Sequence, residues 1–199
     1  MQTKPRGIVY STVSLLLISG LIALMVSVVN YLTAPAIKAA GQQKIKDSIG
    51  LVFSDCLDFA EITQECRENG FLDGIDGIKA VYRVQSGNGG EDGYCVVSVT
   101  GGYGGEVEML SGFTGDGLIS GVRVLSADGE TPGVGQRIKE NRFLWGFGGL
   151  KCSAPAAVDG VSGATVSSSA AVRAVNNACT VMQNILGLSP ETADEEVPG

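Results

Sequence analysis

A run of small residues in the C-terminal part of the chain carries hydroxyl side chains at a spacing that could hold an anion. The run is Asp159-Gly160-Val161-Ser162-Gly163-Ala164-Thr165-Val166-Ser167-Ser168-Ser169, and it leads into an apolar pattern typical of a helix. Small side chains let backbone N–H groups approach a phosphate, and a helix N-terminus carries partial positive charge. Ser and Thr are also the preferred N-cap residues of ordinary helices. The residues alone therefore leave two roles open, anion binding and helix capping.

The composition excludes several kinds of catalytic site. The chain has 199 residues, with 14 Lys and Arg, 21 Asp and Glu and no His, so it has neither a Ser-His-Asp triad nor a His metal ligand. None of its five cysteines forms a C-x-x-C pair, which argues against a zinc or iron–sulfur site. The net charge of −7 and the scattered basic residues argue against a nucleic-acid surface. We expect no catalytic residue and no metal site in this chain.

An apolar stretch near the N-terminus is long enough to cross a membrane. No charged residue lies between Arg6 and Lys38, and Ile8 to Leu32 is almost wholly apolar or small. At about 1.5 Å per residue such a helix spans a hydrocarbon core of about 30 Å. A cleaved signal peptide has an apolar region of only about 7–15 residues, so the length favours a retained anchor. Lys4 and Arg6 precede the stretch without an acidic residue, which predicts a cytoplasmic N-terminus and an external domain.

The rest of the chain predicts an α+β fold with an antiparallel sheet and packed helices. Helical spacing continues from Ala36 to Phe53, and strand-like segments follow over 78–84, 94–100, 106–113 and 118–125. Gly115-Asp116-Gly117 joins the last two segments as a hairpin signal. A short helix is expected over 136–144 and an amphipathic helix over 167–186. Cys56 and Cys66 flank a short polar segment and are candidates for a disulfide in an oxidising compartment. For Cys95, Cys152 and Cys179 the alternative is that they are scattered small hydrophobes.

Two motifs carry a resemblance to a known family. Ser162-Gly163-Ala164-Thr165 resembles the S/T-G-A-T flavinylation motif of FMN-binding domains, and Glu130-Thr131-Pro132-Gly133-Val134-Gly135 resembles their upstream E-T-P-G-x-G motif. With its N-terminal span, the whole chain is similar to the G subunit of the Rnf ion-translocating electron-transport complex. The C subunit of the sodium-pumping NADH:quinone reductase shares both motifs, tends to be longer, and is the alternative within this family.

The resemblance implies a cofactor and a site. FMN would be attached covalently through its phosphate to Thr165 by a separate flavin transferase that uses FAD. The further cofactor contacts expected from the motifs are Ser162, Gly163, Ala164, Ser168, Glu130 and Thr131. Many relatives have His two residues before the motif's Glu, where this chain has Asp128; this difference leaves flavin attachment intact.

The resemblance also implies partners and a reaction. The chain would relay electrons among other membrane subunits of a complex that oxidises ferredoxin, reduces NAD⁺ and moves sodium ions or protons. It would have no turnover alone, and it would sit in the bacterial inner membrane as a single-pass protein with its flavin domain on the outer side. Two interpretations from other classes are a pilin-like structural protein and a regulatory membrane protein that binds FMN without a covalent bond.

These expectations divide the chain into five segments. They are a cytoplasmic N-terminus at 1–7, a transmembrane helix at 8–34, a membrane-proximal helix at 35–58, the FMN-binding domain at 59–188 and a disordered acidic tail at 189–199.

Overall fold

The computed structural model describes residues 5–54, 56–87 and 92–188. The chain divides into two compact units, Met1–Lys44 and Ile45–Gly199. The expectations for Lys4 and for the acidic tail at 189–199 lie outside the described residues. The α+β fold expected from the sequence is confirmed.

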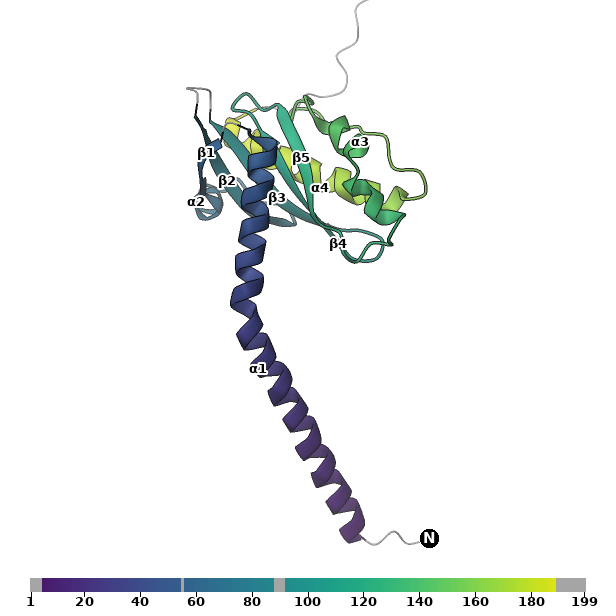
Figure 1. Ribbon diagram of the computed structural model, residues 1–199. Helices are drawn as coiled ribbons and strands as arrows, with labels where there is room; N and C mark the ends of the chain where they lie inside the picture. Colours follow the sequence, from purple (N-terminus) through teal and green to yellow (C-terminus); the bar gives the residue numbers. More distant parts are fainter. Residues whose placement is uncertain (1–4, 55, 88–91, 189–199) are drawn as a thin grey trace, which may run out of the picture. The chain divides into compact units, whose positions relative to one another are not determined.

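The first long element is a single helix, α1 (Pro5–Val52), which contains the apolar stretch and also the helix expected after it (Figure 1). Helical structure continues through Pro35 and Gly41 without interruption. Large apolar side chains in its N-terminal part are exposed, among them Leu16 at 67% and Val26 at 64%. Within the described part of the chain, α1 is the one helix that is long and apolar enough to cross a membrane.

The second unit is built on a five-stranded antiparallel sheet in the order β1-β2-β3-β4-β5. The four expected strands are confirmed with small shifts at their ends: β2 (Ile78–Ser86), β3 (Gly93–Gly101), β4 (Glu106–Phe113) and β5 (Ile119–Ser126). Two elements were not expected, β1 (Cys56–Glu61) at the edge of the sheet and the short helix α2 (Thr63–Glu68). β1 pairs with β2 through an irregular register at Cys56 and Asp58, so its sequence lacks a regular strand pattern.

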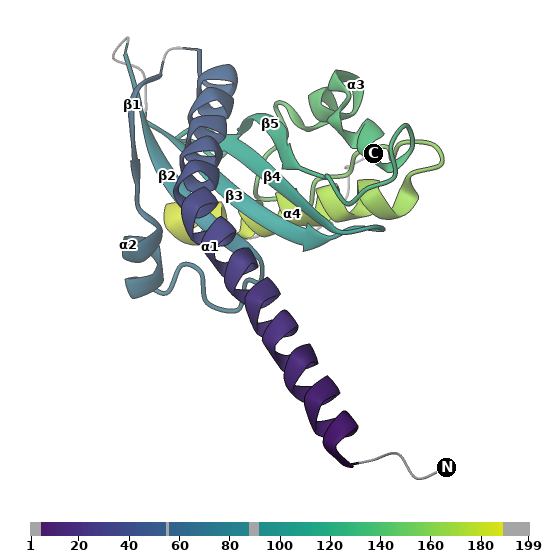
Figure 2. The same cartoon turned by 60° about the horizontal axis from the view of Figure 1, so that its bottom comes forward.

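The long C-terminal helix, α4 (Thr165–Leu186), runs across one face of the sheet (Figure 2). Its sheet-facing side is made of small residues, Ala170, Ala174 and Ala178 among them, which are fully buried and let the helix approach closely. Two hydroxyls of β3 fix its position along the sheet. Ser98 Oγ donates to the carbonyl of Ala174 at 2.8 Å, and Thr100 Oγ1 donates to that of Ala170 at 2.7 Å. These bonds hold the N-terminal half of α4 over β3.

The opposite face of the sheet carries a second, smaller core. Ile49, in the last turns of α1, is fully buried there with Val84, Val97 and Leu110. The last turns of α1, from Ile45 onward, belong to the same compact unit as the sheet. Because both faces are covered, β3 is buried on both sides, as its burial pattern requires.

The helix expected over 136–144 is not one helix, so that expectation was wrong. Three short elements occupy the segment: η1 (Gly135–Lys139), α3 (Asn141–Leu144) and η2 (Trp145–Phe147). Glu140 separates the first two because its backbone is extended, with φ −68° and ψ 136°. The segment still has an apolar side, since Phe143 and Phe147 are buried in edge-to-face contact at 5.3 Å between ring centroids.

All five cysteines lie in the described residues and are free thiols. The disulfide between Cys56 and Cys66 is not formed, because Cys66 packs in the core under α4 and Cys56 contacts the core on the other face of the sheet. Burial raises the pKa of every thiol, and it raises that of Cys179 to about 12. The alternative, that the cysteines are small hydrophobes, agrees with these surroundings.

The packing of the end of α1 predicts a contrast between two neighbouring residues. Replacing buried Ile49 by Ala should lower the free energy of unfolding by about 2–5 kcal/mol, because the change leaves a cavity in the smaller core. Leu51→Ala, on the same helix but 66% exposed, should have little effect. Urea unfolding of the full chain in detergent, followed by the fluorescence of Trp145, measures both. Equal stability of the two variants would contradict the packing of Ile49 against the sheet.

Candidate functional site

The hydroxyl-rich run begins α4 two residues earlier than expected, at Thr165 instead of Ser167. The N-cap residue is Ala164, whose side chain cannot accept a hydrogen bond, and no side-chain cap is formed in the described structure. The backbone N–H of Ser168 donates to the carbonyl of Ala164 at 2.9 Å, so the three N–H groups before it have no helical acceptor. Ordinary capping by Ser or Thr is therefore wrong for this helix, and the anion-binding role remains.

A tight turn presents Thr165 at the start of α4. Gly163 adopts φ +81°, a left-handed conformation that a side chain would strain, and the N–H of Ala164 donates to the carbonyl of Val161 at 2.9 Å. The buried Ser168 hydroxyl accepts a hydrogen bond from the N–H of Val161 at 2.9 Å. These hydrogen bonds of Val161 stabilise the turn, while the side chain of Thr165 stays exposed.

Thr165 lines a cavity of about 460 Å³ in which three segments distant in sequence meet. That volume is in the range of about 300–1,000 Å³ typical of small-molecule sites. One wall is Tyr103, from the β3–β4 connection. A second consists of Glu130, Thr131, Val134 and Gly135. The third is residues 163–167, at the start of α4.

The carboxylate of Glu130 joins these segments. Glu130 is 1% exposed, and its Oε1 accepts hydrogen bonds from the N–H groups of Tyr103 at 2.7 Å and Gly104 at 3.2 Å. Its Oε2 accepts one from the hydroxyl of Ser167, in the first turn of α4. The backbones of Gly102 and Gly135 pass so close that a side chain at either position would collide with this carboxylate. Glu130 therefore fixes the β3–β4 connection against the N-terminus of α4.

The loop after Glu130 is a compact turn. The carbonyl of Thr131 accepts hydrogen bonds from the N–H groups of Val134 and Gln136, each at 3.2 Å, and Gly133 adopts φ +74°. Thr131 and Val134 remain exposed at the cavity. The glycines of the E-T-P-G-x-G motif thus serve turn geometry and the close approach of Glu130.

The structure brings most of the expected site residues together, but not all of them. Ser162 lines a separate cavity of about 560 Å³, together with Arg142 and Asp159. Ser168 lines neither of these two cavities, because its oxygen faces Val161. The expected residues that share the cavity with Thr165 are Gly163, Ala164, Glu130 and Thr131.

Sequence reasoning missed three apolar residues of this cavity, Tyr103, Val134 and Val166. The glycine-rich run from Gly101 to Gly105 was the available signal for the first, since it allows backbone segments to pack closely. Val134 occupies the variable position of the E-T-P-G-x-G motif, so the motif does not specify its side chain.

Asp128, at the position where many members of the resembled family have His, lies beside the site loop and outside its cavity. Its carboxylate is 3.5 Å from Lys139 Nζ and accepts a hydrogen bond from Ser126 Oγ at 3.2 Å. These contacts connect the end of β5 to η1. Asp128 therefore has surface partners and does not line the Thr165 cavity.

Comparisons with known proteins identify the region around the cavity. Residues 102–180, which include all three walls, match the FMN-binding domain family. Among solved structures, the C subunit of the Na⁺-translocating NADH-quinone reductase from Parabacteroides distasonis matches with a TM-score of 0.46 and 22% identity, over 54% of this chain and 63% of that one.

Two relatives match over nearly the whole chain. The G subunit of the Na⁺-translocating ferredoxin:NAD⁺ oxidoreductase complex from Acetobacterium woodii is 27% identical, over 86% of this chain and 89% of the relative. The G subunit of the ion-translocating oxidoreductase complex from Cereibacter sphaeroides is 30% identical, over 89% of both chains. This chain therefore belongs to the family of G subunits of ion-translocating oxidoreductase complexes.

Proposed function

We propose that this chain is the electron-relay subunit of a membrane-bound ferredoxin:NAD⁺ oxidoreductase complex that translocates sodium ions or protons, and that it carries FMN covalently on Thr165. The observation that carries the proposal is the exposed hydroxyl of Thr165 at the first residue of an uncapped helix, inside a cavity formed by both family motifs. The kind of complex and the reaction in this proposal are taken from the names of the relatives.

The residues of the cavity fit FMN. The N–H groups in the first turn of α4, which have no helical acceptor, suit a phosphate. The partial positive charge of the helix N-terminus would stabilise it by about 0.3–1 kcal/mol. Val134 and Val166 offer apolar contacts, and Tyr103 offers an aromatic ring. Glu130 and Ser167 hold the walls together. Ser168 supports the turn through its hydrogen bond with the N–H of Val161, and Ser162 lies outside this cavity.

Attachment requires only a reachable hydroxyl. Thr165 Oγ1 would hold FMN through a bond to the phosphorus; with FAD as the donor, the pyrophosphate bond would break, AMP would be the leaving group and the hydroxyl would lose its proton. The small residues Gly163 and Ala164 leave space for a flavin transferase beside the exposed Thr165. When bound, FMN supplies reversible electron transfer, and the protein contributes orientation and electrostatics. A relay of this kind needs no acid or base catalyst, so the lack of His is no obstacle.

The membrane arrangement is part of the proposal. α1 would cross the inner membrane once, with Lys4 and Arg6 in the cytoplasm and the FMN-binding domain on the outer side. The exposed apolar side chains of its N-terminal part would contact lipid and the other membrane subunits of the complex. Electrons would then pass between the flavin and redox groups of those subunits.

The attachment residue is tested by two matched substitutions. Thr165→Val nearly preserves volume but removes the hydroxyl, so it should abolish covalent flavin. Thr131→Val makes the same change at another exposed threonine of the cavity and should leave covalent flavin in place. Ser162→Ala should also retain it. Flavin fluorescence of the protein band after denaturing electrophoresis, from cells that contain the transferase, measures all three. A fluorescent band in Thr165→Val would assign the bond to a different residue.

The role of Glu130 in holding the site predicts a loss of stability. In Glu130→Gln the oxygen that accepts from Ser167 becomes an amide NH2, which can only donate, so the hydrogen bond from Ser167 to the carboxylate is lost and the free energy of unfolding should fall by about 1–3 kcal/mol. Glu140→Gln, at an exposed residue paired with Arg137, is the control and should change stability by less than about 1 kcal/mol. Chemical unfolding of the full chain in detergent compares the two. If both variants lost less than about 1 kcal/mol of stability, the Glu130 carboxylate would not be what joins the β3–β4 connection to α4.

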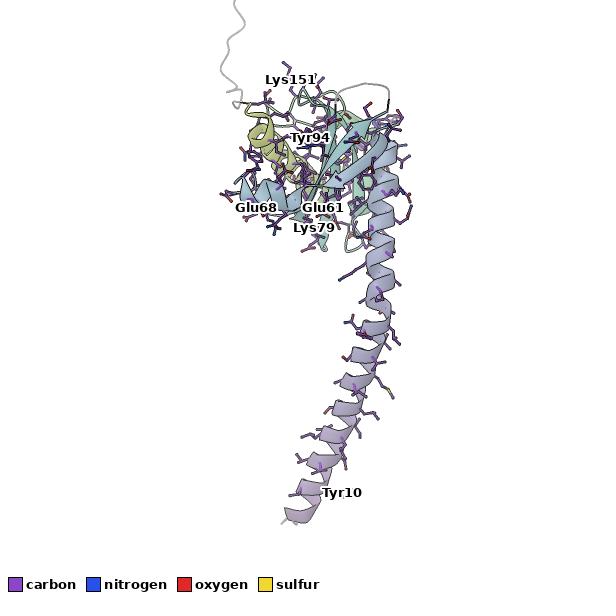
Figure 3. All side chains as sticks on the ribbon, turned by 90° about the vertical axis from the view of Figure 1, so that its left-hand side faces the viewer. Tyr10, Glu61, Glu68, Lys79, Tyr94 and Lys151 are labelled. Atoms are coloured by element: carbon purple, nitrogen blue, oxygen red, sulfur yellow. The ribbon has the colours of Figure 1, made fainter. Side chains whose placement is uncertain are left out.

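The orientation of the chain in the membrane is tested by two single cysteine substitutions, one before α1 in the sequence and one after it. Glu68, exposed at the end of α2 (Figure 3), is replaced by Cys in one variant, and Gln2 in another. Glu68→Cys should react with a membrane-impermeant maleimide while the inner membrane is intact, and Gln2→Cys only after it is opened. The native thiols give a low background because four of them are buried. The reverse pattern of labelling would overturn the orientation.

A further inference from the structure

We infer that Tyr103 is the residue on which the isoalloxazine ring of the flavin stacks, and that its ring shields the flavin from solvent. This inference rests on the proposed function, because it assigns the ring position of a flavin attached at Thr165. It names a positioning residue that neither motif contains.

Exposed apolar side chains concentrate at this cavity. Among the described residues after α1, at 56–87 and 92–188, the exposed large hydrophobic residues are Leu57, Tyr103, Val134, Trp145, Val166 and Leu188. Three of these six line the cavity of Thr165, and they come from three different segments. A gathering of exposed apolar side chains around a cavity indicates a ligand surface, whereas single exposed residues are ordinary. Tyr103, 74% exposed, is the one aromatic residue among the residues that line this cavity.

The backbone of Tyr103 is fixed while its side chain is not needed for the fold. Its N–H donates to the buried Glu130 carboxylate at 2.7 Å, and the backbone of Gly104 lies against that of Gly129. The phenol makes no hydrogen bond within the described residues, and most of the ring is exposed. The backbone of the β3–β4 connection is therefore positioned by the Glu130 carboxylate and by Gly129, without the Tyr103 side chain. The tyrosine side chain therefore lines the cavity without a hydrogen-bond partner among the described residues.

The same carboxylate ties Tyr103 to the attachment residue. Glu130 Oε1 accepts from Tyr103, and Oε2 accepts from Ser167, which lies two residues after Thr165 on α4. The buried carboxylate of Glu130 therefore fixes the backbone of Tyr103 relative to the start of α4, where the phosphate would be attached to Thr165. Val134 and Val166 form apolar walls but have no π face. Stacking on an aromatic ring favours offset contact with a second flat ring, which the isoalloxazine provides.

Fluorescence tests the inference, because a stacked phenol quenches flavin emission by donating an electron to the excited ring, whereas Phe is a poor donor. In Tyr103→Phe and in Tyr103→Leu the emission per covalent flavin should rise several-fold over the wild type. Tyr103→Trp should keep the quenching. Collisional quenching by iodide should increase in Tyr103→Leu, where the covering ring is lost, but not in Tyr103→Phe. Each variant is the full-length protein purified with its covalent flavin.

The control is Trp145→Leu, which removes an equally exposed aromatic side chain, 75% exposed, that does not line this cavity. Trp145→Leu should change neither the emission per covalent flavin nor the quenching by iodide. Unchanged emission in Tyr103→Phe at equal flavin content would overturn the inference, and so would equal access of iodide to the Phe and Leu variants. Failure of the proposed function looks different, since the wild type itself would then carry no covalent flavin.

Discussion

The buried carboxylate of Glu130 joins three parts of the chain that are distant in sequence. One oxygen binds the backbone of the β3–β4 connection and the other binds the first turn of α4, while Glu130 itself starts the E-T-P-G loop. A buried carboxyl group is costly unless it is hydrogen-bonded, so this arrangement is stable only when all three segments are in place. The glycines around it follow from the same constraint, since Gly102 and Gly135 give the carboxylate room. The cavity of Thr165 is the space enclosed between these walls.

The sheet and α4 provide the rigid frame for that arrangement. α4 lies close to β3 because most of its buried residues are small, and the hydroxyls of Ser98 and Thr100 donate to its carbonyls. These contacts set the position of the helix along the sheet, and hence where its N-terminus and Thr165 lie. The N-terminus itself is left without a side-chain cap. An uncapped helix N-terminus carries partial positive charge, so it would suit a negatively charged group attached at Thr165.

The sequence predicted the features that local pattern controls. Apolar runs and turn signals predicted the long apolar helix, four strands and α4, and the two motifs predicted a site whose residues Thr165 and Glu130 line one cavity. The pattern did not predict β1, because the irregular pairing of Cys56 and Asp58 with β2 leaves no alternation to detect. It placed the start of α4 at Ser167, because serine is a preferred residue at helix starts, whereas the helix begins at Thr165 and its N-cap residue is Ala164. The link from Glu130 to Ser167 and the place of Tyr103 arise from tertiary contacts, which no local spacing specifies.

The central claim is that Thr165 bears the flavin, and peptide mapping by mass spectrometry tests it most directly. Cleavage after Lys151 and Arg173 releases residues 152–173, which include Ser162, Thr165 and Ser167 in one peptide. For protein purified from its native membrane, we expect this peptide to carry the mass of one FMN less one water, and fragmentation to place the added mass on Thr165. An unmodified peptide, or added mass on a neighbouring serine, would contradict the claim.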